Sequence, residues 1–379
     1  MSTALKASPL KLRWSMLAVS GVLLSLSLVI FLVLMAVSWK TVAPTLFWQL
    51  EYMGVLILVT ISTRTITVRK VLGFYFLGLG VCALLALVLS TPVRLVFNWP
   101  FWVDVPVPII EETVKILPLL AFVFWPGSRW RKSAGLSDYL VAGAALGSGF
   151  TLLEDLLRGY EWQRMLDAHT GPHLGVLYLF PAADLQYGLS SSSLLHLKAA
   201  FLGHGPATAM IGLALGVAVI YGHRQGRWRW LIALPAAMWV WVVWDHVWFN
   251  LSSDGAFDGA LGVIQSLVGL RGHLAGWVLL VAGLAAIVLD ARAIRRHWSQ
   301  AADASRLRLD ELALWRCPVD RRTPLHLYLL VVARPKLRRM AAYVARNDLS
   351  PEALRGGVDR LSAGLRRPPL LSGSSTLPV

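Results

Sequence analysis

Apolar runs long enough to cross a membrane recur along the whole chain and restrict its fold more than any other feature. Eight runs hold 17 to 24 residues each, and a helix needs about 20 residues to cross the apolar part of a bilayer. Hydrophobic residues make up 56% of the chain and charged residues only 15%, which exceeds what a soluble domain of this size can bury. We therefore predict an all-α fold, a polytopic bundle of transmembrane helices. The expected spans are about 14–37, 46–63, 71–90, 106–125, 138–157, 199–221, 230–251 and 274–290.

The basic residues between these runs predict the orientation of the bundle. Cytoplasmic connections of membrane proteins carry an excess of Lys and Arg, and a single orientation places every basic cluster of this chain on that side. We expect a multi-pass protein of the cell membrane, of bacterial inner-membrane type, with both termini cytoplasmic and the 159–198 connection outside. Residues 17–37 are too long for a removable signal peptide and lack a small-residue cleavage site, so they should remain as an anchor. The clusters are Lys6, Lys11 and Arg13; Arg64, Arg69 and Lys70; Arg129, Arg131 and Lys132; Arg224, Arg227 and Arg229; and Arg292, Arg295 and Arg296.

Four of the apolar runs contain ionisable side chains at helical spacing. A charged side chain at the centre of a membrane helix costs about 2.5 to 3.5 kcal/mol, so such groups usually face a bundle interior and mark function. Proline suits a first helical turn, and Pro106 and Pro108 should therefore begin the fourth helix. The predicted topology then places all four polar groups at one depth, in the outer third of the membrane. Each group is given with the residues paired to it at helical spacing: Glu111, Glu112 and Lys115; Glu154 with Phe150; His204 with Thr208; and His246 with Asn250.

Each motif also has an ordinary structural interpretation. The two glutamates could form a salt bridge with Lys115 at an interfacial helix start, and Glu154 could end a solvated helix. His204 and Thr208 could form hydrogen bonds between closely packed helices. His246 and Asn250 lie among tryptophans, which are common at membrane interfaces. Together these interpretations require four independent coincidences at one depth, so the pattern favours chemistry inside the membrane.

The four motifs resemble those of a known family. EETVK, FTLLE, HGPAT and HVWFN are similar to the EExxK, FxxxE, HxxxG-type and HxxxD/N-type motifs of the PrsW family of intramembrane proteases. That family is related to the CAAX-protease-like membrane proteins, to the type II CAAX prenyl proteases and to the gamma-secretase scaffold subunit. Two positions depart from the pattern: Thr208 stands where glycine is more usual, and Asn250 stands where an acid also occurs. The quoted motifs cover about residues 106–250.

The resemblance implies a glutamic-type endopeptidase that needs no cofactor and cuts a membrane-anchored protein near the outer membrane face. Glu112 or Glu111 would act as the general base for water. His204, His246 and Asn250 would orient the water, stabilise the oxyanion or protonate the leaving amine. Glu154 would fix a histidine tautomer, and Lys115 would neutralise the second glutamate.

Two alternatives stay open at this point. Two histidines and a glutamate also form a recognised catalytic zinc set, although HExxH is absent. A proton-coupled transporter or a non-catalytic scaffold would also keep buried ionisable groups, but no repeat between the two halves of the chain is visible. The two cysteines fall on either side of a membrane boundary and provide neither a disulfide framework nor a metal site.

The chain divides by composition into four parts. We expect N-terminal transmembrane helices over residues 1–105, a catalytic transmembrane core over 106–255, a final transmembrane helix over 256–290 and a basic cytoplasmic tail over 291–379. The tail holds 17 Lys and Arg against 7 Asp and Glu, a balance of +10. Beside a membrane helix this charge favours contact with anionic lipid rather than nucleic acid.

Overall fold

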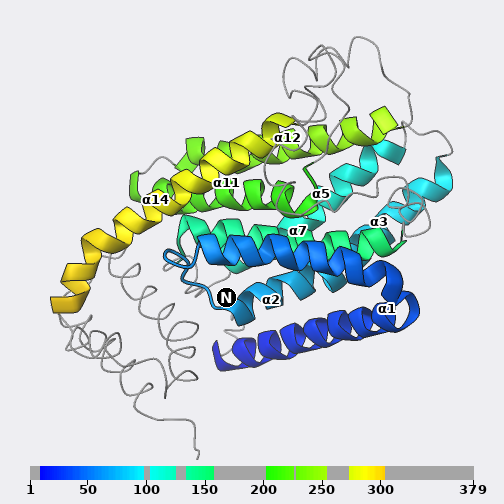
Figure 1. Cartoon of the computed structure of the whole chain (residues 1–379), viewed down its shortest axis with the longest axis horizontal. Helices are drawn as coiled ribbons and strands as arrows, with labels where there is room; N and C mark the ends of the chain where they lie inside the picture. Colours follow the sequence, from blue (N-terminus) through cyan, green and yellow to red (C-terminus); the bar gives the residue numbers. More distant parts are fainter. Residues whose placement is uncertain are drawn as a thin grey trace, which may run out of the picture.

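The computed structural model describes residues 9–97, 103–124, 134–157, 202–225, 228–253 and 273–303. Regular secondary structure within these ranges is entirely helical, which agrees with the predicted fold class. The longer helices run roughly parallel or antiparallel to one another in a single bundle (Figure 1). The elements are α1 (Pro9–Val59), α2 (Val68–Phe76), η1 (Leu77–Cys82), α3 (Ala83–Val96), α5 (Pro106–Phe124), α7 (Leu136–Leu157), α11 (His204–Gln225), α12 (Trp228–Ser253) and α14 (His273–Asp303).

The first two predicted spans form one helix, α1, which is assigned as helical over 51 residues. Figure 1 shows that its ribbon bends back, so that its dark blue first half and its lighter blue second half run in opposite directions. The helix ends at Val59, before the predicted end at residue 63, and the Thr60 hydroxyl donates to the Leu56 carbonyl at 2.6 Å just beyond that end. The connection expected between the two spans, residues 38–45, is therefore helical.

The third predicted span is longer than expected and contains a π-helical turn. Residues 68–96 are helical without a break, with η1 between α2 and α3. Gly78 of η1 lies so close to the Leu146 carbonyl oxygen of α7 that a side chain at this position would overlap it. The extra residue of a π turn changes the helical register. Gly78 then faces Leu146 of α7 and Gly80 faces Ser27 of α1, while α2 and α3 on either side remain regular α-helices.

Helix α7 is the centre of the bundle and packs most closely against α11. Every residue from 134 to 150 is buried, and small residues permit the close approach, as is typical of helix pairs in membranes. A side chain at Gly143 would lie 2.5 Å from the Thr208 carbonyl oxygen, and one at Gly147 would overlap the His204 carbonyl oxygen. The position of the α11 backbone is thus fixed by the absence of side chains on α7.

Helices α5 and α12 lie against α11 and complete the part of the bundle that carries the predicted polar motifs. Helix α5 begins at Pro106, as predicted from its prolines. Helix α11 begins at His204, and the prediction of a helix from residue 199 is wrong for residues 202 and 203, which are not helical. Gly203 has a φ of 84°, a conformation that only glycine adopts readily. It therefore stops the helix from starting earlier and leaves His204 at the first position of α11.

A second group of buried polar side chains joins α7, α14 and the segment after α1, at the end of α7 opposite to Glu154. The Asp290 carboxylate of α14 accepts hydrogen bonds from the Leu136 and Ser137 amides at 3.0 and 2.7 Å. Asp138 accepts from the Thr65 amide at 2.7 Å and from the Ile66 amide at 2.9 Å. The first amides of a helix lack partners within the helix, so Asp290 caps the α7 N-terminus and fixes it to α14. Asp138 fixes the same end of α7 to the segment after α1.

Four helical stretches in the described residues are long and apolar enough to cross a membrane. They are Val68–Val96, Leu136–Glu154, His204–Gly222 and Leu274–Arg295. Helices α5 and α12 have 19 and 26 residues, but the total of eight spans stays a prediction. Large apolar side chains on α1, α3 and α14 are exposed, among them Val22 at 66%, Leu95 at 76% and Val281 at 65%, as expected for surfaces that face lipid. The expected outer connection 159–198 and the tail beyond residue 303 lie outside the described residues.

Candidate functional site

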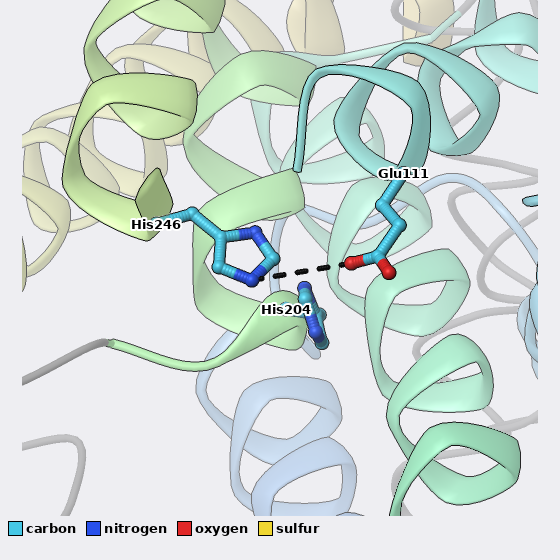
Figure 2. Close-up of side chains that lie close together, drawn as sticks. All are labelled: Glu111, His204 and His246. Carbon is cyan, nitrogen blue, oxygen red and sulfur yellow. Dashed lines mark ion pairs between the residues drawn. The ribbon is translucent and has the colours of Figure 1, made fainter. Parts of the chain in front are cut away.

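Four helices bring the predicted polar residues together at one end of the bundle. Glu111, Glu112 and Lys115 come from α5, Glu154 from α7, His204 from α11 and His246 from α12. Figure 2 shows Glu111 and His246 facing each other, with His204 close to both. Glu112 and Lys115 are 0% exposed, and Glu111, His204 and His246 are at most 6% exposed. The contacts show that these groups meet at one level of the bundle, and their depth in a membrane stays a prediction.

Glu112 is the centre of the cluster because one of its oxygens has three nitrogen partners. Its Oε1 accepts from the Lys115 ammonium at 2.6 Å and lies 3.0 Å from His246 Nδ1 and 3.2 Å from His204 Nδ1. All these groups are buried, and a buried charge is tolerated only when it is paired and hydrogen-bonded. Glu112 therefore compensates Lys115 and positions His246.

His204 connects Lys115 to Glu154. Its Nδ1 lies 2.5 Å from the Lys115 ammonium, and its Nε2 contacts a carboxylate oxygen of Glu154. An ammonium only donates, so the network assigns Nδ1 as the acceptor and places the proton on Nε2, from which it is donated to Glu154. This agrees with the role of fixing a histidine tautomer that was expected for Glu154. Both ring nitrogens of His204 thus have partners.

Glu111 differs from its neighbour in its surroundings. Oε2 is buried without a hydrogen-bond partner among the described residues in both glutamates, whereas Oε1 of Glu112 contacts Lys115 and His246. The nearest ionisable atom across the site is His246 Nε2 at 3.9 Å (Figure 2), which is too long for a direct hydrogen bond. His246 Nδ1 faces Glu112 Oε1 and should carry the proton, which leaves a lone pair on Nε2. Two bases therefore face each other across a gap.

Aromatic rings close the cluster on the side of α7. The Lys115 ammonium lies 4.5 Å from the centroid of the Phe150 ring, a distance at which the ring face attracts a cation. The Phe150 ring also packs edge-on against His204 at 5.0 Å, and the two histidine rings lie 4.9 Å apart. Phe150 is 3% exposed. It shields the ionic contacts from solvent and restricts the orientation of His204.

The remaining two predicted residues occupy the same helices as the histidines. Thr208 lies one turn after His204, is fully buried and has no hydrogen-bond partner for its hydroxyl among the described residues. Asn250 lies one turn after His246 on α12 and is half-buried.

One buried acid near the site was not singled out from the sequence. Asp245 precedes His246, is 4% exposed and lines a small cavity together with Trp241 of α12 and Ala275 of α14. An aspartate within the apolar run WVVWDHVWF is itself a signal of a polar environment inside the bundle. The sequence did not single out Asp245, because the adjacent His246 already explains a polar residue in that apolar run.

The cluster also contains a set of side chains that fits a divalent metal. Glu111, His204 and His246 each offer one ligand atom, and these atoms lie within 4.8 Å of one another. One carboxylate and two imidazoles form a ligand set found in catalytic zinc sites, and the unpaired Oε2 of Glu111 is the kind of buried atom that such an ion would satisfy. The residues present thus fit a metal by their chemistry, although either nitrogen of His204 would have to give up its present partner.

Comparison with known families gives one match. Residues 67–287 match the family model described as PrsW family intramembrane metalloprotease. This range contains every residue of the cluster and covers more than half of the chain. Comparisons with curated proteins and with solved structures give no significant match.

Proposed function

This chain belongs to the PrsW family of membrane proteases, and we propose that it is an intramembrane endopeptidase whose water nucleophile is activated by Glu111. Its substrate would be a membrane-anchored protein cut near the outer membrane face. The family match and the apolar helices support a multi-pass membrane protease. The glutamate mechanism is supported by one observation above all: the unpaired Glu111 Oε2 faces His246 Nε2 across 3.9 Å.

This gap suits a water molecule. A water oxygen about 2.8 Å from each atom would donate one hydrogen to Glu111 and the other to His246, with about 90° between the two directions. Its lone pairs would then point away from both bases, toward a bound peptide. The site would hold the nucleophile without a serine or cysteine.

Hydrolysis would then proceed through the residues of the cluster. Glu111 removes one proton from the water while the oxygen forms a bond to the scissile carbonyl carbon. The proton passes from Glu111 to the amide nitrogen, the C–N bond breaks, and a carboxylate and an amine are released. Asn250, one turn from His246, is our candidate for an amide donor to the oxyanion.

The other charged residues would keep this geometry fixed. Glu112 holds His246 in the tautomer that carries its proton on Nδ1, and Lys115 compensates the Glu112 charge. Glu154 and Lys115 hold His204 between them. Preorganised charges of this kind contribute to catalysis because they need not rearrange during the reaction.

A metal-dependent protease is the second candidate, and the family description together with the Glu111, His204 and His246 set favours it. These three residues would be the ligands. A bound zinc ion would polarise the scissile carbonyl and lower the pKa of its bound water. Glu112 and Glu154 would then orient the imidazoles of His246 and His204 by contacting the ring nitrogen that does not bind the ion, as carboxylates commonly do at metal sites. The partners of both His204 nitrogens are the observation that favours the metal-free candidate.

New protein termini in cells test the protease proposal. Cells that express the full chain are compared with cells that express Glu111→Gln, and membrane-protein fragments that depend on the wild type are mapped. Loss of a general base should lower cleavage about 10²- to 10⁴-fold. Thr113→Val is the matched control, because Thr113 lies on the same turn of α5 and its hydroxyl donates to the Ile109 carbonyl. If no fragment depends on the wild type, the transporter or scaffold alternative replaces the protease.

Metal dependence separates the two protease candidates. The purified full chain, reconstituted in lipid with a substrate mapped in cells, is treated with a chelator and then supplied with zinc. Unchanged cleavage supports the glutamate mechanism. Loss of cleavage that zinc restores, together with about one zinc per chain by elemental analysis, would replace it by the metal mechanism.

A further inference from the structure

One side of α14 changes from apolar to cationic along its length. Its exposed large apolar side chains include Val281, Leu284 and Val288, and the side chains of Arg292 and Arg295 further along the helix are exposed as well. These five residues follow one another at intervals of three or four positions, so they lie on the same side of the helix. The two arginines belong to the last turn of a helical stretch that is long enough to cross a membrane.

The length of this side of α14 matches one leaflet of a bilayer. Val281 precedes Arg292 by eleven residues, about 16 Å at 1.5 Å per residue. Half of the apolar core of a bilayer is about 15 Å thick. If Arg292 lies at the level of the lipid headgroups, Leu284 and Val288 therefore face the acyl chains of the same leaflet.

The arginines of α14 are part of an end of the bundle whose exposed charge is positive. Arg69 at the start of α2 is exposed, like Arg292 and Arg295. Asp138 and Asp290, the acids next to these helix ends, are buried. Their carboxylates accept hydrogen bonds from backbone amides. The acids are thus directed into the bundle, and the cations face its surroundings.

We propose that this side of α14 binds an anionic phospholipid, with the lipid phosphate at Arg292 and Arg295 and an acyl chain along Leu284 and Val288. The site is separate from the protease site and does not rest on the proposed function. A zwitterionic lipid would bring no net charge to the arginines, and a soluble phosphate would leave the apolar side chains uncovered. Only an anionic lipid complements both parts of the surface. The contact with anionic lipid that is expected of the basic tail would begin here.

A bound lipid would help to hold α14 on the bundle. Only 28% of the membrane stretch of α14 is buried, against 94% of the one in α7, and the last turns of α14 continue past the other helices (Figure 1). Asp290 fixes α14 to the start of α7, two residues before Arg292. A ligand that binds only the folded chain stabilises it, so the lipid should raise the unfolding temperature.

Thermal unfolding of the purified full chain tests this binding. The chain is freed of lipid in a neutral detergent and supplied with phosphatidylglycerol or with phosphatidylcholine of the same acyl chains. We expect the unfolding temperature to rise more with phosphatidylglycerol, and this difference to shrink as salt is added, because salt screens exposed charges. Inorganic phosphate at the same concentration should not reproduce the rise, because it covers no apolar surface.

Single substitutions locate the site. Arg292→Gln and Arg295→Gln should each weaken phosphatidylglycerol binding about fivefold, because one arginine near an anionic surface contributes about 1 kcal/mol. Arg292→Lys keeps the charge and should keep the binding. Arg94→Gln is the matched control, because Arg94 is also exposed, but Ser90 and Thr91 occupy the turn before it in place of large apolar residues. Titration with lipid, followed by unfolding temperature and by native mass spectrometry, measures each affinity.

Three results would overturn the inference. They are equal stabilisation by the two lipids, the same rise with inorganic phosphate alone, and an equal loss of affinity in Arg94→Gln and Arg292→Gln. Each titration is compared with the unfolding temperature of the same variant without lipid, so a change in intrinsic stability does not alter the measured affinity. The protease proposal depends on Glu111 and stands or falls independently of these results.

Discussion

Glu111 and Glu112 are adjacent in the sequence and have different environments. Residues i and i+1 of a helix point about 100° apart, so one carboxylate faces Lys115 and both histidines while the other faces the gap in front of His246. The sequence analysis left open which glutamate is the base. The contacts favour Glu111, because its Oε2 faces His246 across a gap, whereas Glu112 is held in a buried ionic centre with Lys115; Oε2 of both glutamates lacks a hydrogen-bond partner among the described residues.

The two glutamates should therefore differ in their effect on stability. Glu112→Gln leaves the buried Lys115 ammonium without its anion, and breaking a buried ion pair in this way costs about 3 to 5 kcal/mol. Glu111→Gln removes no hydrogen bond of its Oε2 and should change stability by less than about 1 kcal/mol. Thermal unfolding of the purified full chain measures both. The double variant Glu112→Gln with Lys115→Met should recover part of the loss, and a larger loss for Glu111→Gln would reverse the assignment of roles.

At the scale of elements, the contact between α7 and α11 sets the position of His204. His204 is the first residue of α11, and its carbonyl packs against Gly147 where a side chain would overlap it. The same two helices supply Glu154 and His204, whose side chains contact each other through His204 Nε2. Helix packing and site geometry thus depend on one glycine.

Gly147→Ala should push α11 away from α7 and separate His204 from its partners. A displacement of about 1 Å at a catalytic group can cost about 100-fold in rate, and we expect a loss of that order in cleavage of a substrate mapped in cells. Gly73→Ala on α2 is the control, because a methyl group there would meet no atom within 4 Å. Equal activity of the two variants would show that the helices adjust without moving the site.

The Asp290 cap at the other end of α7 should affect stability and leave the chemistry unchanged. Asp290→Leu removes the acceptors of two α7 amides, and loss of an N-terminal cap costs about 0.5 to 2 kcal/mol. The site lies at the far end of α7, about 26 Å away at 1.5 Å per residue from Ser137 to Glu154. We expect a lower unfolding temperature with an unchanged kcat. A reduced kcat in folded protein would show that the two ends of α7 are coupled.

At the scale of the whole molecule, the contacts place the two polar clusters at opposite ends of the bundle. Glu111, Glu154, His204 and His246 meet at one end, and Thr63, Ser137 and Asp290 meet near the other. The predicted basic cluster of Arg64, Arg69 and Lys70 lies next to the second group. The positive-inside rule predicts that the second end is cytoplasmic and that the site lies near the outer face.

Reporter fusions test this orientation. Fusions after residues 130, 180, 225 and 300 should report inside, outside, inside and inside, because the basic clusters flank the first, third and fourth positions. Cysteine labelling at the same positions in intact cells provides the second readout. An outside position for residue 300 would place the site near the cytoplasmic face, and the substrate would then be cut on that side.

The sequence alone determined the helical fold class and singled out the polar residues that meet in the bundle. These properties follow from local composition, since apolar runs of membrane length must be helical and ionisable groups within them must face inward. The start of α5 at Pro106 followed equally from the local chemistry of proline.

Only the tertiary structure decided how these helices are arranged. The bend within α1, the π turn η1 next to α7, the start of α11 at His204 and the Asp138 and Asp290 contacts depend on residues far apart in the chain. The different surroundings of Glu111 and Glu112 also depend on which helices become neighbours. Periodicity and charge act over one or two helical turns, whereas a partner for a buried atom is supplied by another helix. The sequence therefore specified the chemical groups of the site, and packing specified which of them is left free to react.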